Sequence, residues 1–128
     1  MNIKNLDSVA FLIGRSFLGI YFLLPGISKI FGYSDTLSLL VSKWLHLASI
    51  DLTIVILLQV GLGVSIIANK YLRESSLILF GLTVLINIYI HNFWDLSSDP
   101  SFAHELQNFV KNTAIAAGLL VLSTKDKD

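Results

Sequence analysis

The chain has 128 residues, contains no cysteine and carries a formal net charge of zero, with only 14% charged residues. This length fits a single domain covering residues 1–128. The missing cysteines exclude disulfides and thiolate metal ligands, and zero net charge gives no general attraction to nucleic acid, so no nucleic-acid partner is expected. Soluble proteins carry about 25% charged residues, and the mean hydropathy of +0.72 leaves more apolar surface than one small core can bury. The composition favours a membrane protein; the alternative is a soluble bundle of unusually apolar helices.

Four apolar segments follow one another along the chain. They cover residues 9–31, 52–69, 75–94 and 106–124. Each is close to the ~20 residues that a helix needs to cross ~30 Å of hydrocarbon. Backbone inside a bilayer must satisfy its own hydrogen bonds, which favours helices. The predicted fold is therefore all-α, a bundle of four transmembrane helices.

The first long loop, residues 33–51, has a helical pattern of its own. Ser34, Asp35 and Thr36 are candidate N-caps. Apolar residues then recur at helical spacing: Leu37, Leu40, Val41, Trp44, Leu45 and Ala48. This pattern predicts a short amphipathic helix on the outer membrane interface, with Trp44 at headgroup depth. In the second long loop, Asp99 and Pro100 predict the N-cap and first residue of the fourth helix.

Lysine and arginine residues near the segment ends predict the orientation. In a four-span topology, most of them fall on one side: Lys4, Lys70, Arg73, Lys125 and Lys127. The opposite side carries Lys43 together with acidic residues, namely Asp95, Asp99 and Glu105. We therefore expect both termini to lie in the cytoplasm.

Polar side chains interrupt the apolar segments, and because ionisable groups are costly inside a membrane, each is a functional hypothesis by default. One set lies toward the outer ends of three helices, and we predict that it binds a ligand: Lys29, His91, Trp94, Lys111 and Asn112. Another set is predicted to face the bundle interior: Arg15, Gln59 and Asn87. Helical spacing places Asn87, His91 and Trp94 on one face, and one stripe of the first helix contains small residues that allow close helix packing: Arg15, Gly19, Phe22, Gly26 and Lys29. The three histidines are not spaced as a metal site.

Most of these residues also have a purely structural interpretation. Lys29 can extend to the headgroups, Trp94 can be an aromatic anchor of the interface, and His91 can cap a helix end. Gln59 and Asn87 fit interhelical hydrogen bonds, and Arg15 can pin the first helix to the cytoplasmic leaflet.

Lys111 is the hardest residue to explain structurally. It lies nearer the N-terminus of its predicted helix than the C-terminus, where the helix dipole does not favour a cation. A structural role requires an acidic partner, and Glu105 and Asp95 are the candidates.

Two stretches carry a resemblance to a known family. Residues 15–29 resemble the R-x-x-x-G-x-x-F-x-x-x-G-x-x-K opening of the DoxX family. Residues 91–94 (HNFW), followed by Lys111-Asn112 and Gly118-Leu119-Leu120, resemble the closing pattern of one branch. Together these motifs extend over nearly the whole chain, and their order and spacing are more specific than any one of them.

The resemblance implies a four-helix protein of the bacterial inner membrane. Relatives include a subunit of a thiosulfate:quinone oxidoreductase and proteins of thiol or oxidative-stress redox complexes. The wider superfamily is similar to eukaryotic cargo receptors and receptor-assembly chaperones. Many members carry a glutamate where this chain has Gln59, and a neutral amide cannot release a proton.

Two functions from different classes follow. The first is a redox accessory protein that binds a quinone-like or other small molecule near the outer leaflet, with Phe22 and Trp94 as the apolar wall. A few convergent polar groups in an apolar lining are typical of such sites. Electrons would come from a partner redox protein or a bound cofactor. The second is a non-catalytic membrane scaffold or chaperone that binds a partner protein through the loop helix. In either case the surroundings are the lipid bilayer, and a homo-oligomer is a further possible assembly.

Overall fold

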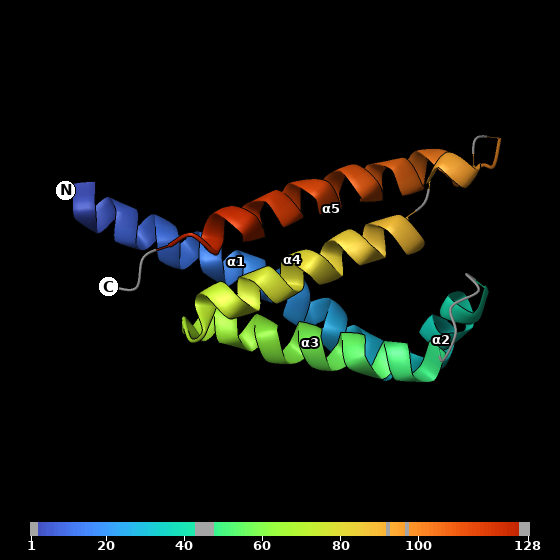
Figure 1. Ribbon diagram of the computed structural model, residues 1–128, viewed down its shortest axis with the longest axis horizontal. Helices are drawn as coiled ribbons and strands as arrows, with labels where there is room; N and C mark the ends of the chain where they lie inside the picture. Colours follow the sequence, from blue (N-terminus) through green and yellow to red (C-terminus); the bar gives the residue numbers. More distant parts are fainter. Residues whose placement is uncertain (1–2, 43–47, 92, 97, 126–128) are drawn as a thin grey trace.

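The computed structural model describes residues 3–42, 48–91, 93–96 and 98–125, and Figure 1 shows their arrangement. Every regular element in these ranges is helical, which confirms the all-α prediction. The elements are α1 (Ile3–Phe31), α2 (Tyr33–Ser42), α3 (Ala48–Ala68), α4 (Leu72–Tyr89), the short 3₁₀ helix η1 (Phe93–Leu96) and α5 (Phe102–Leu122). The four long helices correspond to the four predicted segments.

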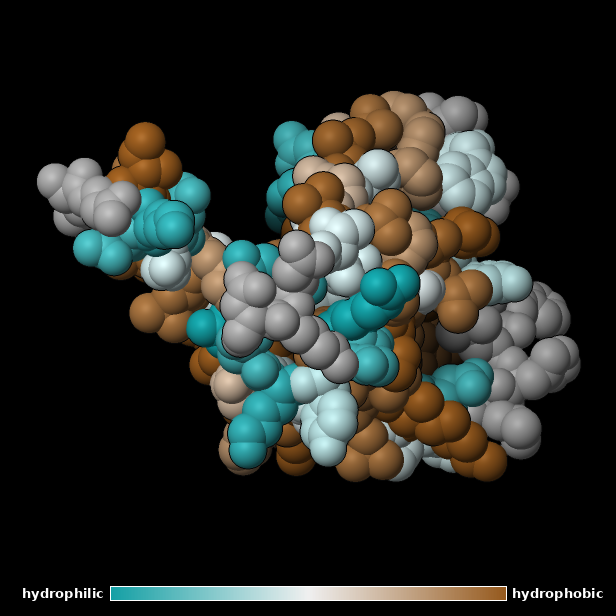
Figure 2. Space-filling model, turned by 60° about the vertical axis from the view of Figure 1, so that its left-hand side comes forward, coloured by the Kyte–Doolittle hydropathy of each residue, from teal (hydrophilic) through white to brown (hydrophobic). Residues whose placement is uncertain are grey.

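The long helices differ in how well they suit a bilayer. Among the described residues, α1, α4 and residues 49–68 of α3 are long and apolar enough to cross a membrane, judged by length and composition. Helix α5 has 21 residues, as many as α3, but its first half is more polar. Figure 2, which turns the end with the termini forward, shows hydrophilic atoms gathered there and hydrophobic atoms over the flanks. These features place the chain in a lipid bilayer.

The helices form two pairs. Helix α1 packs mainly against α3, and α4 packs mainly against α5. Both termini lie at one end of the molecule, here called the terminal end, and α2 lies at the opposite end, here called the α2 end (Figure 1). The two pairs approach each other at the terminal end and diverge toward the α2 end (Figure 1). One buried residue from each long helix forms the core: Phe22, Ile66, Leu79 and Leu119.

Glycines determine how closely α1 and α3 approach. A Cβ atom on Gly63 would lie 2.9 Å from the carbonyl oxygen of Gly19 and 3.1 Å from the backbone nitrogen of Leu23. A Cβ on Gly26 would lie 2.9 Å from Cγ2 of Val60. The predicted stripe of small residues is therefore the face on which the α1 backbone contacts α3.

The end of α4 and the start of α5 differ from the sequence expectation. Helix α4 ends at Tyr89, five residues before the predicted end of its segment, so His91 and Trp94 do not continue its face. Helix α5 begins at Phe102, with Ser101 at its N-cap position, rather than at Pro100. Asp99 instead accepts hydrogen bonds from the backbone nitrogen and hydroxyl of Ser101, at 2.9 and 2.8 Å. The first of these bonds is the main reason why the pKa of Asp99 lies below its usual value.

The loop helix exists, but it begins at Tyr33 and ends at Ser42. Leu40 is its buried residue and packs with Leu52 of α3. The helical spacing predicts Ala48 in this helix, but Ala48 is the first residue of α3. Trp44 and Leu45 lie outside the described residues, so the expected headgroup position of Trp44 stays a prediction.

Candidate functional site

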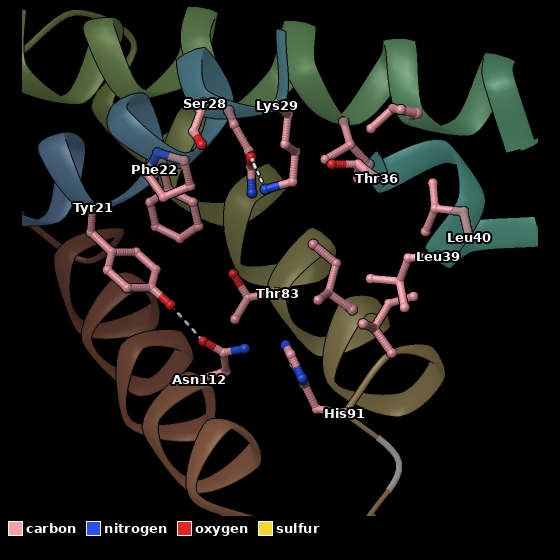
Figure 3. A pocket seen from close by; sticks show the side chains of 16 residues that line it. Tyr21, Phe22, Ser28, Lys29, Thr36, Leu39, Leu40, Thr83, His91 and Asn112 are labelled. Carbon is pink, nitrogen blue, oxygen red and sulfur yellow. Dashed lines mark hydrogen bonds between the residues drawn. The ribbon is translucent and has the colours of Figure 1, made fainter. Parts of the chain in front are cut away.

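A cavity of about 410 Å³ lies between the two helix pairs, with α2 residues in its lining. All five α-helices and His91 contribute to its lining, and most of the lining is apolar. Its apolar wall includes Phe22, Pro25, Leu39, Leu40, Leu52, Val55, Ile86 and Ile90. Its polar groups are Tyr21, Ser28, Lys29, Thr36, Gln59, Thr83, His91 and Asn112. Figure 3 shows several of these polar side chains pointing into the same space.

Lys29 enters the cavity from the last turn of α1. Its Nζ donates a hydrogen bond of 3.0 Å to Oε1 of Gln59, which is buried on α3. The ammonium group therefore lies inside the bundle and does not extend to the headgroups. An amide accepts this bond without cancelling the charge, and no carboxylate forms an ion pair with Lys29 in the described part of the chain. Lys29 is thus a cationic donor that a ligand oxygen can share.

Tyr21 and Asn112 connect the two helix pairs across the cavity. The Tyr21 hydroxyl donates a hydrogen bond of 2.6 Å to Oδ1 of Asn112 on α5 (Figure 3). Asn112 is buried, and its Nδ2 group remains as a donor. Tyr21 is not among the site residues predicted from the sequence, although its spacing indicates the cavity face of α1. Tyr21, Pro25 and Lys29 follow one another at intervals of four residues and share one face of α1.

His91 lies just beyond the end of α4 and points into the cavity (Figure 3). Its Nδ1 is 2.7 Å from Oε2 of Glu105 in the first turn of α5. A carboxylate partner at Nδ1 fixes the ring orientation and leaves Nε2 for a ligand. Glu105, one of the two acidic residues considered as a partner for Lys111, therefore pairs with His91.

Two members of the predicted ligand set do not line the cavity. Lys111 is exposed on α5, because it precedes the inward-facing Asn112 and adjacent helix positions point about 100° apart. Trp94 belongs to η1 and packs against Phe93 and Phe109, with ring centroids 5.3 and 5.6 Å away. The early end of α4 explains its position, because the helical register that would align it with His91 is interrupted.

The three residues expected in the bundle interior are all buried. Arg15 donates to the backbone oxygens of Ile66 and Ile67 at the end of α3. Asn87 donates to the Phe109 backbone oxygen at 3.0 Å, and to the Thr113 hydroxyl at 3.2 Å. Gln59 alone of the three also lines the cavity.

Comparison with known proteins agrees with this architecture. The DoxX family model matches residues 10–92. The chain belongs to the DoxX family. It is also 24% identical over 115 residues to the inner membrane protein YphA of Escherichia coli (strain K12), an alignment that covers 90% of this chain and 81% of that protein. No solved structure matches the chain.

The DoxX match ends at residue 92, so it includes every residue that lines the cavity except Asn112. Tyr21, Lys29 and Gln59 lie within the matched region, as does His91. Asn112 lies beyond it, on α5. The hydrogen bond from Tyr21 to Asn112 and the His91–Glu105 ion pair both join the matched region to α5. In this DoxX protein, α5 therefore completes the site.

Proposed function

We propose that this DoxX protein is a redox accessory protein of the bacterial inner membrane that binds a quinone-like molecule in the cavity. The observation that supports this most directly is that Lys29, His91 and the Tyr21–Asn112 pair bring polar groups to one apolar cavity. The volume of about 410 Å³ falls within the roughly 300–1,000 Å³ of typical small-molecule sites. The YphA relative supports the inner-membrane assignment.

The donors suit a ring that carries carbonyl or hydroxyl oxygens. Lys29 Nζ on α1 and Asn112 Nδ2 on α5 can donate hydrogen bonds to the oxygens of such a ring, since both residues line the cavity. Phe22 and the aliphatic lining contact the ring faces. An imidazole can donate or accept a proton, so His91 can supply the proton that accompanies an electron delivered to the ligand by a partner oxidoreductase.

Two lysines provide a matched test. Lys29→Met and Lys111→Met make the same change, but only Lys29 lines the cavity. A hydrogen bond from a charged donor contributes roughly 1.5–3 kcal/mol, so Lys29→Met should raise the Kd of a dimethoxy-methyl-benzoquinone roughly ten- to a hundredfold. Lys111→Met should leave the Kd unchanged. Both values come from equilibrium binding to purified protein in mild detergent.

The competing function is a scaffold or chaperone for a partner protein. It predicts that the quinone does not bind wild-type protein, or that Lys29→Met and Lys111→Met bind it equally well. Thermal unfolding of both variants serves as the control for folding. A lower Kd for Lys29→Met than for the wild type would also contradict the proposed site.

A further inference from the structure

A second hollow lies between α3 and α4, and neither α1 nor α5 contributes to its lining. It encloses about 560 Å³ and is lined almost entirely by aliphatic side chains. Its apolar lining is Leu40, Ile54, Val55, Leu58, Leu77, Ile78, Gly81, Leu82, Leu85, Ile86 and Ile90. Its polar members are Asp51, at the α2 end of α3, and Tyr89, the last residue of α4. We call this hollow the tail groove.

The tail groove and the cavity are contiguous. Four residues line both hollows: Leu40, Val55, Ile86 and Ile90. All four have aliphatic side chains, so the boundary between the hollows contains no polar group that would need a partner. On the cavity side of this boundary lie Lys29 and His91, and on the groove side the lining continues along α4 to Leu77.

The dimensions of the groove fit an extended hydrocarbon chain. From Ile86 at the boundary to Leu77, α4 extends about 13 Å at ~1.5 Å per residue. Gly81 lies midway along this stretch, and a Cβ atom there would meet nothing within 4 Å. The missing side chain thus widens the groove where a tail would lie.

We propose that the ligand is amphipathic, with a polar ring in the cavity and an apolar tail that crosses the aliphatic boundary into the tail groove. This inference rests on the proposed function for the ring of the ligand, and it adds a hydrocarbon tail to that ligand. A phospholipid acyl chain suits the groove alone, whereas a tailed ring also accounts for the position of the groove next to the cavity that holds Lys29, His91 and Asn112. The occupant is therefore a quinone-type ring attached to a long hydrocarbon chain.

The test uses a dimethoxy-methyl-benzoquinone whose alkyl chain ends in a photoreactive diazirine. Protein in mild detergent is irradiated with this probe, and the labelled residues are mapped by mass spectrometry. We expect labels on groove residues of α3 and α4, such as Leu58 and Leu77, and loss of these labels when unlabelled decyl-quinone is in excess. Gly81→Phe should abolish the groove labels, because the new ring occupies the tail position.

Gly61→Phe is the matched control. Gly61 is exposed on α3, has nothing within 4 Å of a Cβ and lines neither hollow, so this variant should keep the groove labels. The tailless ring should bind Gly81→Phe as tightly as it binds the wild type, which separates the tail from the ring.

Three results would overturn the inference. Labels spread over lipid-facing residues such as Phe17 and Val121 would place the tail in bulk detergent or lipid. Groove labelling by a photoreactive phospholipid that excess decyl-quinone does not displace would assign the groove to membrane lipid. Tight binding of the tailless ring, combined with equal labelling of Gly81→Phe and wild type, would reject the tail while retaining the proposed function. Failure of the tailless ring to bind at all would reject the proposed function.

Discussion

Arg15 shows how a charged residue is accommodated in the bundle. Its side chain is only 7% exposed, and it donates hydrogen bonds to the Ile66 and Ile67 oxygens. These carbonyls belong to the last turn of α3, where a cation is favoured by the helix dipole, and the Ile66 oxygen also accepts a hydrogen bond from the Asn69 backbone nitrogen. The guanidinium group also lies 5.1 Å from the centroid of the Phe11 ring. Arg15 is therefore a cap that α1 supplies to α3.

Replacing Arg15 should destabilise the fold. Arg15→Met removes the side-chain donor from both oxygens. The Ile66 oxygen keeps its hydrogen bond from the Asn69 backbone nitrogen, whereas the Ile67 oxygen loses its side-chain donor, and an unsatisfied buried group costs about 1–3 kcal/mol. Arg15→Lys keeps the charge and one donor direction, so its loss should be smaller. The measurement is the free energy of unfolding in mixed detergent micelles. Equal stability of Arg15→Met and wild type would show that the cap contributes nothing.

The spacing of residues along a helix predicts some of the inward-facing positions but not others. The stripe on α1 was predictable, because a 3.6-residue period alone places Arg15, Gly19 and Phe22 on one face, and all three are buried. Which of Lys111 and Asn112 faces inward was not predictable. The two are adjacent, and only the packing of α5 against α4 decides which of them faces inward. The sequence prediction included both residues in the ligand set, and of the two only Asn112 lines the cavity.

At the scale of elements, the α1–α3 contact depends on residues without side chains. Gly63→Ala places a Cβ against the backbone of Gly19 and Leu23, where neither atom can move without shifting a helix. Overpacking of this kind costs typically 1–3 kcal/mol. Gly61→Ala on the same helix meets nothing within 4 Å and should be neutral or stabilising by up to ~1 kcal/mol, because alanine favours helix.

The two variants should therefore differ in sign when their thermal unfolding is compared under identical detergent conditions. If Gly63→Ala melts at or above the wild-type temperature, the close approach of α1 and α3 does not need glycine. Because both substitutions are made in one helix, helix propensity alone cannot produce a difference between them.

Helix boundaries were the least predictable feature at this scale. The apolar composition of residues 75–94 gave no reason to end the third helix at Tyr89. The end is determined by tertiary contacts: His91 pairs with Glu105, and the Phe93 ring packs 5.2 Å from that of Phe109. Both partners lie on α5, so the residues that determine where α4 ends are more than ten positions further along the chain.

At the scale of the whole molecule, the structure places both termini at one end, as an even number of spans requires (Figure 1). The short α3–α4 link at the same end carries Lys70 and Arg73. Because positive residues in short loops favour the cytoplasm, we predict that this end is cytoplasmic. A periplasm-active reporter should be silent after Asp128 and active when inserted after Pro100.

The opposite pattern of reporter activity would show that the protein has the inverted orientation, with the cavity in the cytoplasmic leaflet. Activity at both positions would show that α5 does not cross the bilayer. That outcome would fit the more polar composition of α5, and it would leave the three apolar helices as the spans.

The divergence of the two helix pairs gives the molecule the form of a wedge. It is closed at the terminal end by the core of Phe22, Ile66, Leu79 and Leu119, and it opens toward α2 (Figure 1). The cavity lies on the open side, and the tail groove lies between α3 of one pair and α4 of the other, so the volumes of both hollows depend on the angle between the pairs. Lateral pressure from the surrounding lipids acts directly on this angle. The thickness and curvature stress of the membrane are therefore physical variables that adjust how much space the site offers.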